Sequence, residues 1–270
     1  MDLARAMGDT WIAPARANAL LDCHKRARRD QSSLLILWHN PGSSATIAFP
    51  MAAPRIALVH AMQLAIDPVV TAFRELWPSA HVTNLLEDSL APDLAAAGSI
   101  TPAIVGRFVD LARYSERCGA NAILFTCSAF GTAIEEAKRS VGIPVLKPNE
   151  AMLEDALAVG SNVALLTTFE PSIPSLRTEL EQLATDRGIT VRISTRSIPE
   201  AILALQQGRA AEHDSLIAAV AAEYRKCDAL VLGQFSMARA ASGIAAAPGR
   251  QVFTSPQSAV NRLKQIFGAH

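Results

Sequence analysis

The stretch Arg55-Ile-Ala-Leu-Val59 is matched in the second half of the chain by the similar stretch Asn162-Val-Ala-Leu-Leu166. Three further apolar pairs recur at the same offset in the numbering, which are 82–83 with 189–190, 122–125 with 229–232, and 145–146 with 252–253. Four matches in one register indicate an internal duplication. Apolar runs of this kind, separated by helices, indicate strands of a parallel sheet that is covered on both faces.

The segments between these runs carry apolar residues at helical spacing. Phe73 and Trp77 lie one helical turn apart in the first half, as do Leu176 and Leu180 in the second. Strands and helices should therefore alternate, with four strands in each half. This predicts an α/β protein of two pseudo-symmetric lobes, each a four-stranded parallel sheet flanked by helices. Because ligands of open α/β sheets bind at the carboxyl ends of the strands, the active site is expected in the cleft between the lobes.

The duplication sets the predicted domain boundaries. Lobe one is expected over residues 54–150 and lobe two over residues 151–256, and residues 257–270 should form a C-terminal helix that packs back on a lobe. Residues 1–53 show no clear helical or strand period and include the basic stretch Lys25-Arg-Ala-Arg-Arg29. We expect a poorly ordered N-terminal extension there, with a basic tail for a partner as the alternative.

The composition excludes several classes of protein. Half of the 270 residues are hydrophobic, which rules out wholesale disorder, and 25 Lys and Arg residues balance 25 Asp and Glu residues. The balance predicts no attraction to nucleic acid or to an anionic membrane, and no apolar run is long enough to cross a bilayer. The four cysteines form no CxxC pair, so neither a zinc cluster nor a disulfide framework is expected, and a reduced cytoplasm is the predicted location.

The sequence also lacks the common cofactor motifs. No GxGxxG pattern and no P-loop pattern follows a candidate strand, so nucleotide chemistry has no support. No HExxH pattern or carboxylate cluster suggests a metal site. We therefore expect no cofactor and no metal.

A cysteine follows the third strand of lobe one, in the run Thr126-Cys-Ser-Ala-Phe-Gly131. Thr132 and Glu135 have the spacing of a capping box that opens a helix. The positive end of a helix dipole favours a thiolate at Cys127, and the small residues after it leave backbone N–H groups able to hold a carboxylate or enolate oxygen. This position indicates a catalytic cysteine, and a buried structural cysteine is the alternative.

The equivalent position in lobe two is Gln234, which lies at the offset of the repeat from Cys127. A glutamine can donate a hydrogen bond to an oxyanion, but it cannot exchange a proton at neutral pH. Ser236 follows shortly after Gln234, and its hydroxyl needs an adjacent base that the sequence does not supply.

Polar residues also end the first strand of each lobe. His60 could act as a base or donate to a substrate, although a structural histidine is the commoner case at such a position. Thr167 and Thr168 suit carboxylate binding, with hydroxyls that cap a loop as the equal alternative. The acids Glu87 and Asp88 follow the second strand and are expected to face solvent rather than to form a lid or a helix start.

These motifs resemble the aspartate/glutamate/hydantoin racemase superfamily, which includes maleate isomerases and arylmalonate decarboxylases. The resemblance rests on the duplicated lobes and on the runs Asn121-Ala-Ile-Leu-Phe-Thr-Cys-Ser128 and Asp228-Ala-Leu-Val-Leu-Gly233, and it covers roughly residues 55–267. It implies cofactor-independent chemistry on a small carboxylic or amino acid, through a carbanion or enolate formed between the lobes. By analogy with small members of the group, it also implies a homo-oligomer.

The resemblance assigns roles to particular residues. In the racemases of this group, one cysteine removes the α-proton and a second cysteine on the opposite face returns it. Cys127 matches the first cysteine, Gln234 stands where the second is expected, and Thr168 matches a threonine often found after the first strand of lobe two. The resemblance therefore implies Cys127 as an acid/base without its usual partner.

The missing second thiol leaves three functions open. The first is a superfamily racemase or isomerase that uses Cys127, in which Ser236, His60 or a water replaces the partner. The second is a one-thiol decarboxylase of a malonate-type acid or a cis-trans isomerase of a small dicarboxylate, and the third is a non-catalytic carboxylate-binding protein. The predicted catalytic residues are Cys127, Gln234 and Ser236, and the predicted substrate-binding residues are His60, Thr126, Ser128, Ala129, Thr167, Thr168, Gly233 and Phe235.

Overall fold

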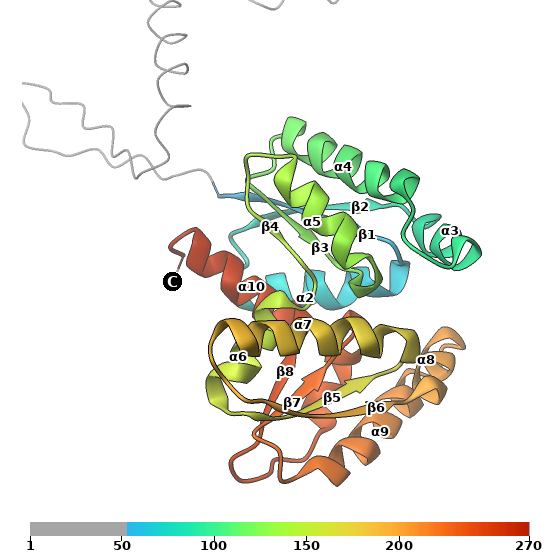
Figure 1. Ribbon diagram of the computed structural model, residues 1–270, viewed down its shortest axis with the longest axis vertical. Helices are drawn as coiled ribbons and strands as arrows, with labels where there is room; N and C mark the ends of the chain where they lie inside the picture. Colours follow the sequence, from blue (N-terminus) through green and yellow to red (C-terminus); the bar gives the residue numbers. More distant parts are fainter. Residues whose placement is uncertain (1–52, 270) are drawn as a thin grey trace, which may run out of the picture. The chain divides into compact units, whose positions relative to one another are not determined.

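The computed structural model describes residues 53–269, and the prediction made for the N-terminal extension lies almost wholly outside this range. Lobe one is built around four strands with helices on both faces (Figure 1). Its elements are β1 (Arg55–His60), η1 (Gln63–Ala65), α2 (Ile66–Leu76), β2 (His81–Leu86), α3 (Leu90–Ala97), α4 (Pro102–Arg117), β3 (Ala122–Phe125), η2 (Ser128–Phe130), α5 (Gly131–Arg139) and β4 (Val145–Leu146).

Lobe two repeats this plan after a crossover helix. Its elements are α6 (Glu150–Val159), β5 (Asn162–Thr167), η3 (Glu170–Ser172), α7 (Ile173–Asp186), β6 (Arg192–Ser197), α8 (Pro199–Gln206), α9 (Ala210–Ala221), η4 (Ala222–Tyr224), β7 (Ala229–Leu232), η5 (Phe235–Gly243), β8 (Gln251–Thr254) and α10 (Ser255–Ile266). The elements written η are 3-10 helices.

The two sheets have the same topology. Their strand orders are β2-β1-β3-β4 and β6-β5-β7-β8, and every pairing within them is parallel. The prediction of two four-stranded parallel sheets flanked by helices is therefore confirmed.

A side-chain bond between the first and third strands is repeated in both lobes. In lobe one the Asn121 side chain accepts a hydrogen bond from the Arg55 backbone N–H at 2.8 Å. In lobe two Asp228 accepts from the backbone N–H groups of Ser161 at 3.0 Å and Asn162 at 2.9 Å. Gly160 makes room for this carboxylate, because a Cβ at that position would overlap the Asp228 side chain.

The constant offset predicted between the two halves fails at the second strand. The sequence placed this strand of lobe two at residues 189–190, whereas β6 begins at Arg192. Most of the shift comes from the preceding helix, because α7 has 14 residues and its counterpart α2 has 11, and the longer loop after α7 supplies the rest. The predicted alternation of single helices with strands was also wrong. Two α-helices separate the second and third strands of each lobe, and the 3-10 helix η5 replaces an α-helix between β7 and β8.

The sheet of each lobe has an apolar cluster on either face. On one face of the lobe-one sheet, Phe108 of α4 packs against Phe125 of β3 and Phe130 of η2, with ring centroids 5.2 and 4.9 Å apart. On the opposite face α2 packs against α10, where the Trp77 and Phe267 rings lie 6.0 Å apart. The last helix thus follows the last strand of lobe two but covers lobe one, beside α2 in Figure 1.

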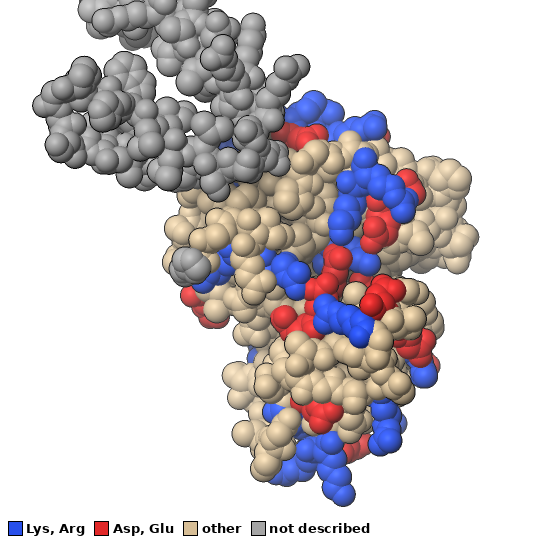
Figure 2. All heavy atoms as spheres, turned by 60° about the vertical axis from the view of Figure 1, so that its left-hand side comes forward, with Lys and Arg blue, Asp and Glu red and all other residues tan. Residues whose placement is uncertain are grey.

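An ammonium group joins the two lobes. The Lys147 Nζ, just after β4, lies 3.1 Å from a Glu135 oxygen on α5 and 3.0 Å from a Glu179 oxygen on α7. Burial acts to lower the pKa of Lys147, but the carboxylates of Glu179, Glu135 and Glu150 together raise it. On the face drawn in Figure 2, basic and acidic side chains are intermixed rather than gathered by sign.

Candidate active site

A cavity of about 760 Å³ is lined by residues of both lobes. Its floor includes the loops that follow β3, β5 and β7 at the carboxyl ends of the strands, and its walls include residues of α3 and α8. None of the lining side chains that the structure describes is Lys, Arg, His, Asp or Glu. Most of the predicted site residues line the cavity, namely Thr126, Cys127, Ser128, Ala129, Thr168, Gly233, Gln234, Phe235 and Ser236.

Cys127 lies between the end of β3 and the short helix η2, and its thiol is half-buried at the cavity. The predicted capping box at Thr132 is wrong. η2 runs directly into α5, which begins at Gly131, so Thr132 already lies inside the helix and no side chain caps its start. The small residues Ser128 and Ala129 of this loop do line the cavity.

The prediction that Cys127 favours a thiolate is also wrong, because its pKa is raised and not lowered. Burial raises the pKa of Cys127 and outweighs the opposing backbone hydrogen bond from Ala129. Transfer of a charge out of water costs more than the one backbone N–H returns at this position. Cys127 therefore rests as a neutral thiol, which is a proton donor.

His60 lies behind the cavity and does not line it. Its ring is fully buried, with Nδ1 2.9 Å from the Thr126 hydroxyl and Nε2 3.0 Å from the Asn84 side-chain oxygen. Burial lowers the pKa of His60, and the Asn84 bond opposes this, so the ring is neutral. Since Asn84 Oδ1 only accepts, Nε2 carries the proton and Nδ1 accepts from Thr126. Both ring nitrogens of His60 are thus engaged, which leaves neither to serve Ser236 as a base.

Thr167 and Thr168 are separated by the structure. Thr167 is fully buried, does not line the cavity, and its hydroxyl has no hydrogen-bond partner among the described residues. Thr168 lines the cavity, and its backbone N–H donates to the Gln234 side-chain oxygen at 2.7 Å, with its hydroxyl at 3.3 Å from the same atom. The Gln234 amide also donates to Ser172 at 2.8 Å.

Asn149 is a lining residue that the sequence reasoning missed. Its side chain is 1% exposed, accepts a hydrogen bond from Ser255 at 2.6 Å, and has an amide nitrogen without a partner among the described residues. The signal that could have found it was its place shortly after the fourth strand of lobe one, at the carboxyl edge of the sheet. Asn149 adds a polar group to the side of the cavity where the chain crosses between the lobes.

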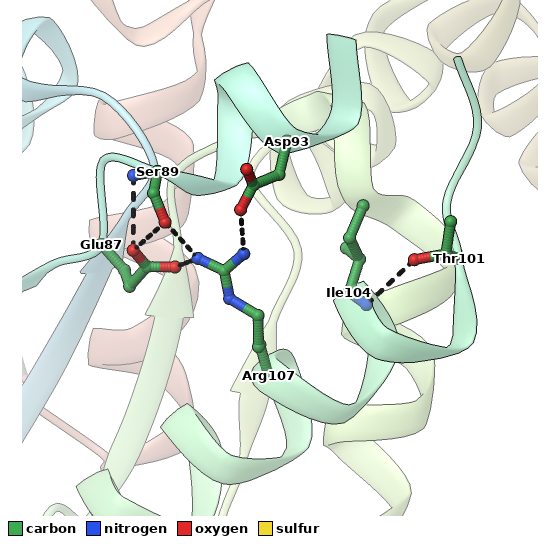
Figure 3. A network of polar contacts seen from close by, with 6 residues as sticks. All are labelled: Glu87, Ser89, Asp93, Thr101, Ile104 and Arg107. Carbon is green, nitrogen blue, oxygen red and sulfur yellow. Dashed lines mark hydrogen bonds and ion pairs between the residues drawn. The ribbon is translucent and has the colours of Figure 1, made fainter. Parts of the chain in front are cut away.

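One wall of the cavity is held by an arginine. Arg107 of α4 pairs with Glu87 and Asp93, and it donates to the Ser89 hydroxyl at 2.6 Å (Figure 3). Ser89 also donates to Glu87 at 2.7 Å. Glu87, Ser89 and Asp93 belong to the start of α3 and the loop before it, and residues 91, 92, 94 and 95 of α3 line the cavity. Glu87 therefore anchors α3, which corrects the expectation that it only faces solvent.

Residues 53–269 contain neither a candidate metal-binding cluster nor a candidate membrane-spanning helix. Within this range, no three His, Cys, Asp or Glu side chains come together in a way that could hold a metal ion. No helix in that same part of the chain is long and apolar enough to span a membrane.

The Asp/Glu/Hydantoin racemase family model matches residues 67–263. The chain belongs to this family. A search of curated proteins found no match.

Solved structures of this family share the fold. A glutamate racemase from Thermus thermophilus aligns with a TM-score of 0.58 at 20% identity, over 80% of this chain and 81% of that one. An aspartate racemase from Picrophilus torridus aligns with a TM-score of 0.61 at 13% identity, over 81% and 96% of the two chains. An unliganded arylmalonate decarboxylase aligns with a TM-score of 0.51 at 16% identity, over 78% and 93%.

Proposed function

We propose that this chain is a cofactor-independent enzyme that uses Cys127 as the acid/base at the α-carbon of a small carboxylic or amino acid. The observation that carries the proposal is a thiol at the carboxyl end of a central strand, facing a cavity that both halves of a racemase-family fold line. The cavity volume is within the range of small-molecule sites.

The chemistry would pass through a carbanion or enolate. In proton removal, the Cys127 thiolate takes the α-proton and becomes the thiol; in decarboxylation, CO2 leaves, the thiol protonates the carbanion, and water returns a proton to the thiolate. In both cases the negative charge that develops on the substrate carboxylate is held by hydrogen bonds from the loop after β3. Ser128 and Ala129 belong to that loop. Positioned donors of this kind stabilise the intermediate more strongly in a cavity than in water, because competing solvent is displaced.

The second candidate is a reaction in which Cys127 delivers a proton to one face of the carbanion, and two observations favour it over racemisation. Cys127 rests as a thiol, which is ready to protonate a carbanion, and the opposite position holds Gln234, which exchanges no proton. A decarboxylase of a malonate-type acid needs one proton delivery and fits both observations. The uncharged lining also offers no carboxylate to an α-ammonium group, which favours a carboxylic acid over a zwitterionic amino acid.

The test is a substrate screen in deuterium oxide, with amino acids, hydantoins, malonates and maleate, followed by NMR. The wild type is compared with Cys127→Ala and with Cys118→Ser, whose cysteine is exposed and does not line the cavity. Loss of general acid–base catalysis should lower turnover on the order of 10²–10⁴-fold in Cys127→Ala alone.

The product distinguishes the candidates. Deuterium wash-in from both enantiomers indicates a racemase, one deuterium in a decarboxylated product indicates a lyase, and tight binding without turnover indicates a binding protein. Equal turnover by wild type and Cys127→Ala would refute the proposed role of the thiol.

A further inference from the structure

We infer that Gln234 determines specificity by filling an oxyanion-binding position of lobe two with its own side-chain amide, so that a second carboxylate on a ligand gains no binding site there. This inference rests on the proposed function, because it assumes that the cavity takes a carboxylate.

The contacts around Gln234 fix the orientation of its amide. A backbone N–H only donates, so the atom 2.7 Å from the Thr168 nitrogen must be the side-chain oxygen of Gln234. The amide nitrogen then faces Ser172, at 2.8 Å, and the Ser172 hydroxyl passes its own hydrogen to the Phe169 carbonyl at 2.6 Å. The amide is thus held at both ends by the loop that follows β5.

The donors around the amide oxygen are those that a carboxylate oxygen would use. The Thr168 backbone N–H and hydroxyl converge on one point, at 2.7 and 3.3 Å. Thr168 and Gln234 both line the cavity, so a ligand could reach these donors if the amide were absent. Since the amide oxygen satisfies them within the same molecule, a ligand oxygen must displace it before it can bind there.

The equivalent positions in lobe one carry no such arrangement. At the offset of the repeat, Ala61 corresponds to Thr168 and Cys127 corresponds to Gln234. At these two positions lobe one therefore has a methyl group and a thiol, whereas lobe two has a hydroxyl and an amide that bond to each other. No Lys, Arg or His lines the described cavity to hold a second negative charge elsewhere.

The experiment compares two ligands that differ by one carboxylate, butyrate and ethylmalonate. Their dissociation constants are measured by NMR titration for the wild type, for Gln234→Ala, and for Ser175→Ala, which removes a lining hydroxyl outside this network. The wild type and Ser175→Ala should bind both ligands with similar affinity. Gln234→Ala should bind ethylmalonate about tenfold more tightly, with its affinity for butyrate nearly unchanged, because the two freed donors of Thr168 would donate hydrogen bonds to the second carboxylate.

Several results would overturn the inference. Weaker binding of both ligands by Gln234→Ala would show that the amide contacts the ligand directly. An unchanged ratio of the dissociation constants for butyrate and ethylmalonate would show that the position holds no anion. If neither the wild type nor the variant binds either ligand, the inference and the proposed function are both overturned. If both proteins bind butyrate but the ratio of the two dissociation constants is the same in each, only the inference is overturned. Gln234→Ser serves as a second variant if Gln234→Ala does not fold, with the same expected change in ratio.

Discussion

The aromatic cluster under the Cys127 loop makes a prediction about stability and about the site together. Phe108 is 1% exposed, does not line the cavity, and contacts Phe130, which does. Replacing a buried Phe by Ala costs about 3–5 kcal/mol through lost transfer free energy and the cavity left behind. With two ring contacts at 5.2 and 4.9 Å, we expect Phe108→Ala to cost about 4 kcal/mol, the middle of that range.

The assay measures the free energy of unfolding in urea and the melting temperature. For a domain of this size, a loss of about 4 kcal/mol corresponds to a drop of roughly 8–16 °C in melting temperature. Natural domains have about 5–15 kcal/mol of stability, so the variant should still fold. Cys127 and Ala129 also pack on this cluster, so loosening it should speed alkylation of Cys127 by iodoacetamide on the order of tenfold, in a background where Cys23 and Cys118 are Ser.

Phe73→Ala is the matched control. Phe73 is 2% exposed, and its ring lies 6.2 Å from that of Trp77, in the cluster on the opposite face of the same sheet. It should lose a similar stability without a change in Cys127 alkylation. A stability loss below about 1 kcal/mol for Phe108→Ala, or equal alkylation in both variants, would refute the idea that this cluster positions the loop that carries Cys127.

Three further predictions concern titration, backbone packing and the cavity wall. Burial lowers the pKa of His60 from the ordinary value of 6.5, so the unfolded chain takes up a proton that the folded chain refuses; the free energy of unfolding should fall as pH drops below that value, and urea titrations at about pH 5–8 should show a flatter profile for His60→Gln. Gly160→Ala should cost about 2–4 kcal/mol by pushing Asp228 off two backbone N–H groups, and Asp228→Ala should add little to it, which a double-mutant cycle in urea measures. Arg107→Met should cost under about 1 kcal/mol, because its ion pairs are partly exposed, yet it should raise KM more than it lowers kcat by loosening α3; an unchanged KM would contradict the role of this wall.

The sequence predicted the parts of the fold that depend on local pattern and repetition. Strands β1, β3, β5 and β7 are continuous apolar runs, and the duplication placed them in one register. The second strand of lobe two was misplaced because the greater length of α7 changes the offset without changing the local pattern. Helix length depends on packing along the sheet, which a repeat in the sequence does not record.

The sequence predicted which strand ends form the candidate site, but it did not predict the pKa of Cys127 or the hydrogen bonds of Gln234. The parallel topology explains why Cys127 and Gln234 both reach one cavity. The direction of the Cys127 pKa depends on burial by residues far away in sequence, so a local argument from the helix dipole gave the opposite sign. The bond between Gln234 and Thr168 joins residues that are far apart in the sequence, and no spacing rule indicates it.

The ammonium group of Lys147 has a consequence for how the two halves move. It lies next to Pro148 and Asn149, which line the cavity, and its charge is shared between helices of opposite lobes. Spreading the halves to admit a ligand would leave Glu135 and Glu179 facing each other across a widening gap without their common cation. Repulsion between those carboxylates would then resist the movement until water solvates them, so the ease of opening should depend on the electrolyte around the protein as well as on the ligand.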